Sequence, residues 1–213
     1  MRRDIPKLCA DSLRAFTKEK YGIKLKAAHA HEIVAAYLGY RSRNALLADN
    51  KYPIENLAEA KVVVMVPDED IDQRRQKLEG LSAELSDSYT LGEAVYAPLF
   101  ADEWWGSDNP PFRSFDKLAK VLVENNDAFQ ATFLYRDQIP MHHFVSVKQD
   151  EDVVVLNVIH SYETTPGEMS RDGQTTITLP RVAGRIGFGS PRMSVCQFTA
   201  GARTTLKSLG VQS

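Results

Sequence analysis

The apolar residues change their spacing near Asp127, and this change limits the fold more than any other feature of the chain. Before it, apolar residues recur at three- and four-residue intervals, which is typical of amphipathic helices. After it, runs over 129–136, 141–148 and 153–162 read as strands separated by short turns, which favours an antiparallel meander. The pattern predicts an α+β fold in which an N-terminal three-helix module precedes a mixed domain with a mainly antiparallel sheet.

Capping residues and glycines divide the first half of the chain into helices. Asp4 is a candidate N-cap of a helix that ends before Gly22, a second helix over 26–38 ends at Gly39, and Ser42 begins a third that runs to residue 49. We expect residues 1–52 to form a basic helical module and residues 53–213 to form an α+β domain whose first half is helical and acidic. Within that domain the patterns predict helices over 67–81, 90–100 and 114–125, and strands over 62–66, 175–179 and 193–198.

The net charge of −2 conceals three segments of unequal charge. Residues 1–52 carry 11 Lys and Arg against 5 Asp and Glu, residues 53–127 carry 7 against 16, and residues 128–213 carry 8 against 7. A basic first segment (+6) therefore precedes an acidic second one (−9). Two interpretations are open: the basic segment contacts nucleic acid, or the two segments neutralise each other inside the fold.

Composition excludes several classes of protein. Hydrophobic residues make up 43% of the chain, yet no run approaches the roughly 18 apolar residues that a membrane span needs. The charged N-terminus is not followed by the apolar region of a secretory signal. Cys9 and Cys196 are too few for a disulfide framework or a cysteine-rich zinc site, so we expect a cytoplasmic protein with no metal, no cofactor and no membrane contact.

The segment from Ala35 to Asn44 has the spacing of a helix-turn-helix motif. A small residue allows two helices to cross closely, Gly39 suits the turn, and the next helix begins with Arg41, Ser42, Arg43 and Asn44. Arginine can recognise guanine and asparagine can recognise adenine, so these four residues are candidates for contacting DNA. The alternative is an interaction module in which the small residues serve helix packing and the arginines are solvated.

A wider pattern includes the same turn. After a first helix of similar length come Glu32, Ala35, Gly39, Tyr40, Asn44 and Leu46. In these residues the stretch 5–48 resembles a short helical module of many proteobacterial and plasmid-borne proteins that are often labelled "glyoxalase superfamily". The resemblance favours a non-enzymatic binding or regulatory accessory protein of a bacterial mobile element. It implies no glyoxalase chemistry, because the metal ligands of those enzymes are spread over paired βαβββ units.

An enzymatic alternative rests on the predicted meander. If the turn over 149–152 pairs Lys148 with Val153, then His143 and His160 share one sheet face, and the preceding turn brings Arg136 near them. Two imidazoles and a guanidinium could bind a phosphodiester and supply a general base and a general acid, as in a small hydrolase or nuclease. The competing interpretation is that both histidines are hydrogen-bonded residues at strand ends.

Two further segments are candidates for contacts. Trp104, Trp105 and Phe112 lie in a loop rich in turn residues, where aromatic side chains could bind a basic protein partner or cover the core. The glycine-rich segment 184–189 lacks the helix and the Lys-Ser/Thr pair of a phosphate-binding loop, so it predicts a turn between strands.

Overall fold

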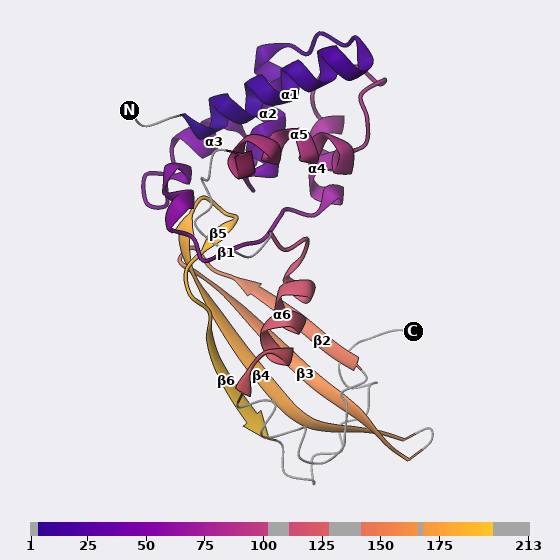
Figure 1. Cartoon of the computed structure of the whole chain (residues 1–213), viewed down its shortest axis with the longest axis vertical. Helices are drawn as coiled ribbons and strands as arrows, with labels where there is room; N and C mark the ends of the chain where they lie inside the picture. Colours follow the sequence, from indigo (N-terminus) through magenta and orange to yellow (C-terminus); the bar gives the residue numbers. More distant parts are fainter. Residues whose placement is uncertain (1–3, 102–110, 128–141, 166–167, 198–213) are drawn as a thin grey trace. The chain divides into compact units, whose positions relative to one another are not determined.

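The computed structural model describes residues 4–101, 111–127, 142–165 and 168–197, and it has the expected α+β fold (Figure 1). In chain order its elements are α1 (Ile5–Tyr21), α2 (Ala27–Tyr37), α3 (Arg43–Leu47), the 3₁₀ helix η1 (Ile54–Glu59), β1 (Val62–Val63), α4 (Asp68–Gln76), α5 (Ser88–Ala101), α6 (Phe115–Glu124), β2 (His142–Gln149), β3 (Val153–Thr165), β4 (Glu168–Ala183), β5 (Gly187–Phe188) and β6 (Arg192–Gln197).

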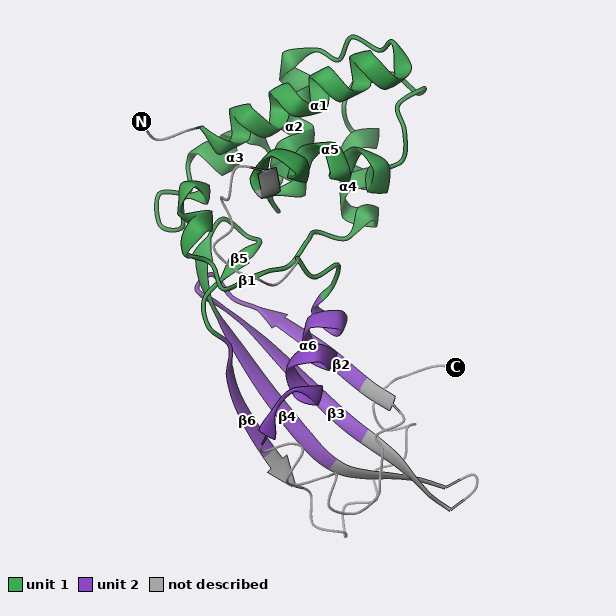
Figure 2. Cartoon of the chain, viewed as in Figure 1, with its two compact units in different colours: residues 1–114, 180–190 green, residues 115–179, 191–213 purple. Residues whose placement is uncertain are grey.

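The chain divides into two compact units, shown in green and purple in Figure 2. Unit 1 comprises residues 1–114 and 180–190, and unit 2 comprises residues 115–179 and 191–213. The strand order is β1-β5-β4-β3-β2, with β6 also paired to β4. Strand β4 contributes its residues up to Leu179 to unit 2 and its last residues, from Pro180, to unit 1. Unit 1 is therefore built from two separate stretches of sequence.

The first helix has the ends that the sequence predicts. The Asp4 carboxylate accepts a hydrogen bond of 3.0 Å from the backbone N–H of Lys7, and Gly22 ends α1 in the left-handed conformation at φ 69°. Ser42 likewise caps α3 by accepting a hydrogen bond from the Ala45 N–H at 3.1 Å. Helices α3 and α4 end at Leu47 and Gln76, before the expected limits of 49 and 81.

Helices α1, α2 and α5 share the apolar core of unit 1. Leu13 of α1, Val34 of α2 and Val95 of α5 are fully buried in the same cluster, and the Ser12 hydroxyl donates to the Ala94 carbonyl at 2.7 Å. The boundary expected after residue 52 therefore lies inside unit 1, because the apolar faces of the first two helices are covered by residues from beyond it.

The buried valine run pairs over a shorter length than expected. The sequence predicts a strand over 62–66, whereas regular pairing covers only Val62 and Val63, which lie opposite Phe188 and Gly187 in β5. Val64 forms a single parallel bridge with Phe112. All three valines are buried, as a β-branched run without polar alternation predicts.

A hairpin from the C-terminal half of the chain completes unit 1. Strand β4 ends at Ala183, Gly184 turns the chain at φ 53°, and β5 returns antiparallel to β4. The predicted turn over 184–189 thus contains a short strand as well. The backbone N–H of Gly184 donates to the Tyr52 carbonyl at 2.8 Å, and a Cβ at Gly184 would lie 2.7 Å from the Ile54 side chain. Glycine allows this close approach.

Strands β2 and β3 of unit 2 pair two residues out of the expected register. Lys148 lies opposite Val155 rather than Val153, because the chain turns more tightly and the Asp150 N–H donates to the Val153 carbonyl at 2.9 Å. A shift of two residues keeps every side chain on its predicted face. Val154, Leu156 and Val158 are accordingly fully buried, and α6 packs against β2 and β3 (Figure 1). The strand expected over 129–136 lies outside the described residues.

We expect Gly39→Ala to destabilise unit 1 more than Gly22→Ala does. Both glycines have left-handed φ values, 84° and 69°, which cost an L-residue about 1 to 2 kcal/mol. A Cβ at Gly39 would additionally lie 2.6 Å from the Cβ of Arg185, whereas nothing lies within 4 Å at Gly22. Overpacking at Gly39→Ala should therefore lower the free energy of unfolding, measured with urea, by about 1 to 3 kcal/mol more than the backbone strain alone. Equal losses for the two variants would contradict the contact with Arg185.

The Cys9 thiol should be unreactive in the folded protein. Burial, assisted by the negative charge of Asp4, raises the pKa of Cys9 to about 12, so the nucleophilic thiolate is absent near neutral pH. In a Cys196→Ser variant we expect no reaction with an aromatic disulfide reagent until guanidinium unfolds the chain. Ala15→Cys in the same background places an exposed thiol on the same helix and should react at once. Rapid labelling of native Cys9 would contradict the packing of α1.

Candidate functional site

The turn between α2 and α3 presents three of the four predicted DNA-contacting side chains to solvent. Arg41, Arg43 and Asn44 are exposed. Ser42 is half-buried, and its hydroxyl oxygen accepts the N-cap hydrogen bond of α3. Ser42 therefore shapes the turn, while the two arginines and the asparagine are free to contact a ligand.

Small and aromatic residues hold this turn in place. Ala35 is fully buried, and its carbonyl accepts a hydrogen bond from the Tyr40 N–H at 2.8 Å across the turn at Gly39. The Tyr40 hydroxyl donates to Asp49 at 2.7 Å, and burial followed by this hydrogen bond raises the pKa of Tyr40 far above its usual value. The guanidinium of Arg185 lies 5.7 Å from the centre of the Tyr40 ring. The backbone that carries the two exposed arginines is thus fixed from several sides.

The acidic middle of the chain does not neutralise these arginines. Within the described residues, no carboxylate forms an ion pair with the side chain of Arg41 or Arg43. Helices α2 and α4 are joined by an ion pair between Glu32 and Arg74, whose nitrogen and oxygen lie 2.5 Å apart. Here the basic segment supplies the carboxylate and the acidic segment supplies the cation. Glu32 also accepts the backbone N–H of Arg43 at 3.3 Å. The first two segments pack together mainly through apolar residues, and the positive charge of the turn remains.

A pocket of about 400 Å³ lies between this turn and α4. Helix α4 contributes Asp70, Gln73 and Arg74, and its C-cap residue Lys77 continues the same face. The other lining residues are Ala36, Gly39, Tyr40, Arg41 and Val66. Three cations and one carboxylate therefore converge on the pocket, together with an amide and a small apolar surface.

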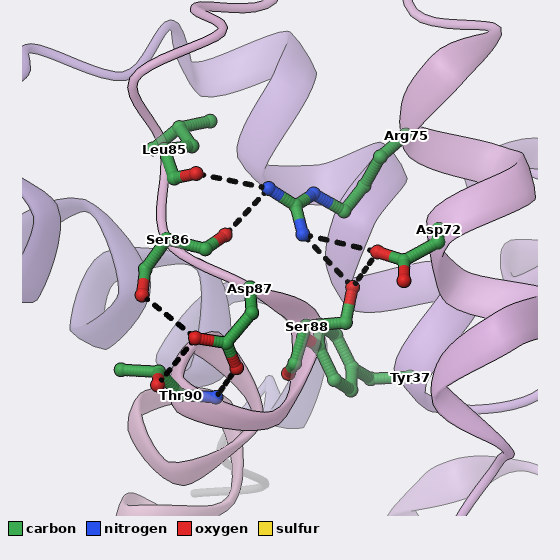
Figure 3. A network of polar contacts seen from close by, with 8 residues as sticks. All are labelled: Tyr37, Asp72, Arg75, Leu85, Ser86, Asp87, Ser88 and Thr90. Atoms are coloured by element: carbon green, nitrogen blue, oxygen red, sulfur yellow. Dashed lines mark hydrogen bonds and ion pairs between the residues drawn. The ribbon is translucent and has the colours of Figure 1, made fainter.

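A network of hydrogen bonds around Arg75 joins α4 to the residues that precede and begin α5, as Figure 3 shows. The Arg75 guanidinium donates to Asp72 at 3.2 Å and to the Ser86 carbonyl at 2.6 Å. It also donates to the Ser88 hydroxyl at 2.9 Å and the Leu85 carbonyl at 3.4 Å. Because Arg74 and Arg75 are neighbours on a helix, they project about 100° apart, so fixing Arg75 orients Arg74 toward the pocket.

This network does not have the features of a catalytic site. Ser88 donates to Asp72 at 2.6 Å, but it is almost completely buried, and no histidine belongs to the network (Figure 3). The hydroxyl of buried Tyr37 donates to the Ser88 carbonyl at 2.5 Å. Asp87 accepts hydrogen bonds from the N–H and hydroxyl of Thr90 at 2.8 and 2.9 Å, which supports the start of α5. The network positions α4 and α5 relative to each other.

The structure brings the two candidate histidines of unit 2 to one register position. His143 lies directly opposite His160 in the β2–β3 pair, although its side chain is outside the described residues, as is all of Arg136. The His160 side chain is fully buried, and its Nε2 lies 2.8 Å from the Thr175 hydroxyl. A buried, hydrogen-bonded imidazole favours the structural interpretation over a hydrolase or nuclease site.

Of the aromatic loop, only Phe112 belongs to the described residues. Trp104 and Trp105 lie outside them, so the predicted partner-binding surface is not described as a whole. Phe112 is half-buried, and its N–H donates to Val63 and its carbonyl accepts from Met65, both at 2.9 Å. The backbone of Phe112 therefore adds two hydrogen bonds to the segment that contains β1 and the residues just after it.

The pocket face of α4 was not among the sequence-predicted site residues. Its signal is the spacing of polar residues at 70, 73, 74 and 77, which a solvated helix face shares. The pairing of this face with the α2–α3 turn depends on tertiary packing, which has no local pattern. Comparisons of the chain with protein-family models, curated proteins and solved structures found no match.

Two other kinds of site have no support in the part of the chain that the structure describes. No helix there is both long enough and apolar enough to cross a bilayer. No group of three or more His, Cys, Asp or Glu side chains there is placed to hold a metal ion.

We expect Arg75→Met to lower the free energy of unfolding by about 2 kcal/mol, because it leaves the Leu85 and Ser86 carbonyls without their side-chain donor and removes the cation beside the Asp72 carboxylate. Lys77→Met, two residues away and exposed, should change it by less than about 0.5 kcal/mol. Urea unfolding followed by circular dichroism measures both. A loss for Arg75→Met no larger than that for Lys77→Met would contradict the proposed role of the network.

Proposed function

We propose that unit 1 binds nucleic acid through the turn between α2 and α3, and that the protein is a non-enzymatic accessory factor. The observation that carries this proposal is that Arg41 and Arg43 are exposed on a rigid turn and that their side chains form no ion pair with a carboxylate among the described residues. Exposed guanidinium groups that form no ion pair and are carried by a fixed backbone favour binding of phosphate groups.

The shape of the turn favours contact with the phosphate backbone of duplex DNA. Helix α3 has five residues, so it extends only about 8 Å, which is short for a recognition helix lying along the major groove. Arg41 and Arg43 therefore suit positioning on the backbone, with Asn44 as the residue next to them that can reach a base edge. This arrangement predicts strong dependence on salt and weak dependence on sequence.

The resemblance of residues 5–48 to a module of plasmid-borne proteins supports the same proposal, since handling of DNA is a frequent task of mobile elements. The assignment to a mobile element and the choice of duplex DNA rest on that resemblance and on the charge of the turn. An acidic protein partner would use the same surface without the salt dependence characteristic of a polyelectrolyte.

We expect the double variant Arg41→Ala/Arg43→Ala to weaken binding to a short fluorescent duplex. Each lost phosphate contact lowers the slope of log K against log salt by about 0.9, so the double variant should lower it by about 1.8. Fluorescence anisotropy over a series of salt concentrations measures this slope. Arg192→Ala, which removes an exposed arginine from β6 in unit 2, is the matched control and should leave the slope unchanged.

Two results would oppose the proposal. The first is that the unmodified protein shows no salt-sensitive binding to duplex at low ionic strength. The second is that Arg192→Ala reduces binding as much as the double variant does, because the attraction would then depend on overall charge rather than on the turn.

A further inference from the structure

We infer that the pocket between the α2–α3 turn and α4 is a nucleotide site that binds a single nucleoside phosphate. The inference extends the proposed function, because the pocket shares Arg41 with the turn that contacts nucleic acid. It assigns a role to the polar face of α4, which the contact with duplex DNA does not use.

The charges around the pocket favour a phosphate group. Among the described residues, neither Arg41 nor Lys77 has a carboxylate partner, although both line the pocket. Arg74 is only partly satisfied, since its Nη2 bonds to Glu32 while its buried Nε has no hydrogen-bond partner among these residues. Two cations that form no ion pair suit the dianion of a phosphate monoester, and its oxygens are acceptors for guanidinium and ammonium groups.

The remaining lining of the pocket suits a nucleoside better than a bare anion. A volume of about 400 Å³ exceeds what inorganic phosphate needs and lies within the usual range of small-molecule sites. Ala36 and Val66 offer apolar contact to a base. The Gln73 amide can both donate and accept hydrogen bonds, and the Asp70 carboxylate can accept from ribose hydroxyls or from exocyclic amines.

The two sides of the pocket are held before any ligand arrives. The Arg75 network fixes α4, and the packing of Tyr40 and Arg185 fixes the turn. A site whose walls are already ordered loses less conformational entropy on binding. The pocket therefore needs no large rearrangement to receive a nucleotide.

The lining of the pocket separates the nucleotide site from the duplex contact. Lys77 lines the pocket and is not part of the turn, whereas Arg43 belongs to the turn and does not line the pocket. Arg41 belongs to both. Single substitutions at Lys77 and Arg43 can therefore test the two binding events independently.

The experiment is calorimetric titration of the full chain with each of the four ribonucleoside monophosphates, with the corresponding nucleosides, and with inorganic phosphate. We expect at least one monophosphate to bind, and its nucleoside and inorganic phosphate to bind at least about tenfold more weakly, because each lacks one of the two groups that the pocket contacts. Lys77→Met should lower the affinity for that monophosphate by about tenfold. Arg43→Ala and Lys24→Met, which change exposed residues that do not line the pocket, should each leave the affinity for that monophosphate unchanged.

Two further arms identify the source of the nucleotide and separate this inference from the proposed function. A phosphorylated single-stranded oligonucleotide that binds in a Lys77-dependent manner, and more tightly than the monophosphate, indicates a nucleotide within a strand. The reverse order indicates a free nucleotide, and both results support the site. Binding of blunt duplex by the same variants measures the turn alone.

The inference is overturned if neither the monophosphates nor the single strand bind, even when duplex binding persists and the proposed function stands. It is also overturned if inorganic phosphate binds as tightly as the nucleotides, or if Lys77→Met retains full nucleotide affinity. Nucleotide binding without duplex binding would instead support the pocket and contradict the proposed function. Urea unfolding of the Lys77→Met variant is the control that separates a loss of nucleotide affinity from a loss of the fold.

Discussion

The arrangement of unit 1 depends on the hydrogen bonds of Tyr37, a fully buried residue in the last turn of α2. Its hydroxyl donates to the Ser88 carbonyl, and its own carbonyl accepts from the Tyr96 hydroxyl at 2.6 Å, while the two rings pack edge to face. Apolar packing alone would allow α2 to slide along α5, but buried directional hydrogen bonds are costly to leave unmade. Ser88 also binds Arg75, so the position of α4 is linked to the same tyrosine.

Much of the fold could be predicted from local patterns in the sequence. Asp4 and Gly22 mark the ends of α1, and the alternation in 153–162 marks the buried face of β3, because caps and pleats depend on neighbouring residues only. The β2–β3 register was missed by two residues, since turn tightness is a weak local signal. The membership of residues 53–101 in the core of the first helices could not be predicted either, because it depends on which distant apolar faces meet.

The candidate site was predictable only in part. Arg41 and Arg43 are recognisable from the residues around Gly39, whose turn the sequence identifies. Lys77 and the rest of the α4 face resemble any solvated helix surface, and they become a pocket only through the packing of α4 against α2. The charges of the segments predict attraction between the basic and acidic regions, yet the ion pair that joins them takes its carboxylate, Glu32, from the basic region and its cation, Arg74, from the acidic one. Summed charges predict long-range attraction and do not identify the partners of individual side chains.

The return of residues 180–190 to unit 1 has a consequence for the order in which the protein can mature on the ribosome. The α2–α3 turn contacts Arg185, and β1 pairs with β5, so these parts stay without their neighbours until more than 60 intervening residues have been translated. Contacts between distant parts of a chain form late and leave apolar surface open to aggregation in the meantime. Unit 1 therefore reaches its final form only after residues 180–190 have been translated, and a nascent chain that stops before residue 180 lacks the Arg185 contact beside the turn that carries Arg41.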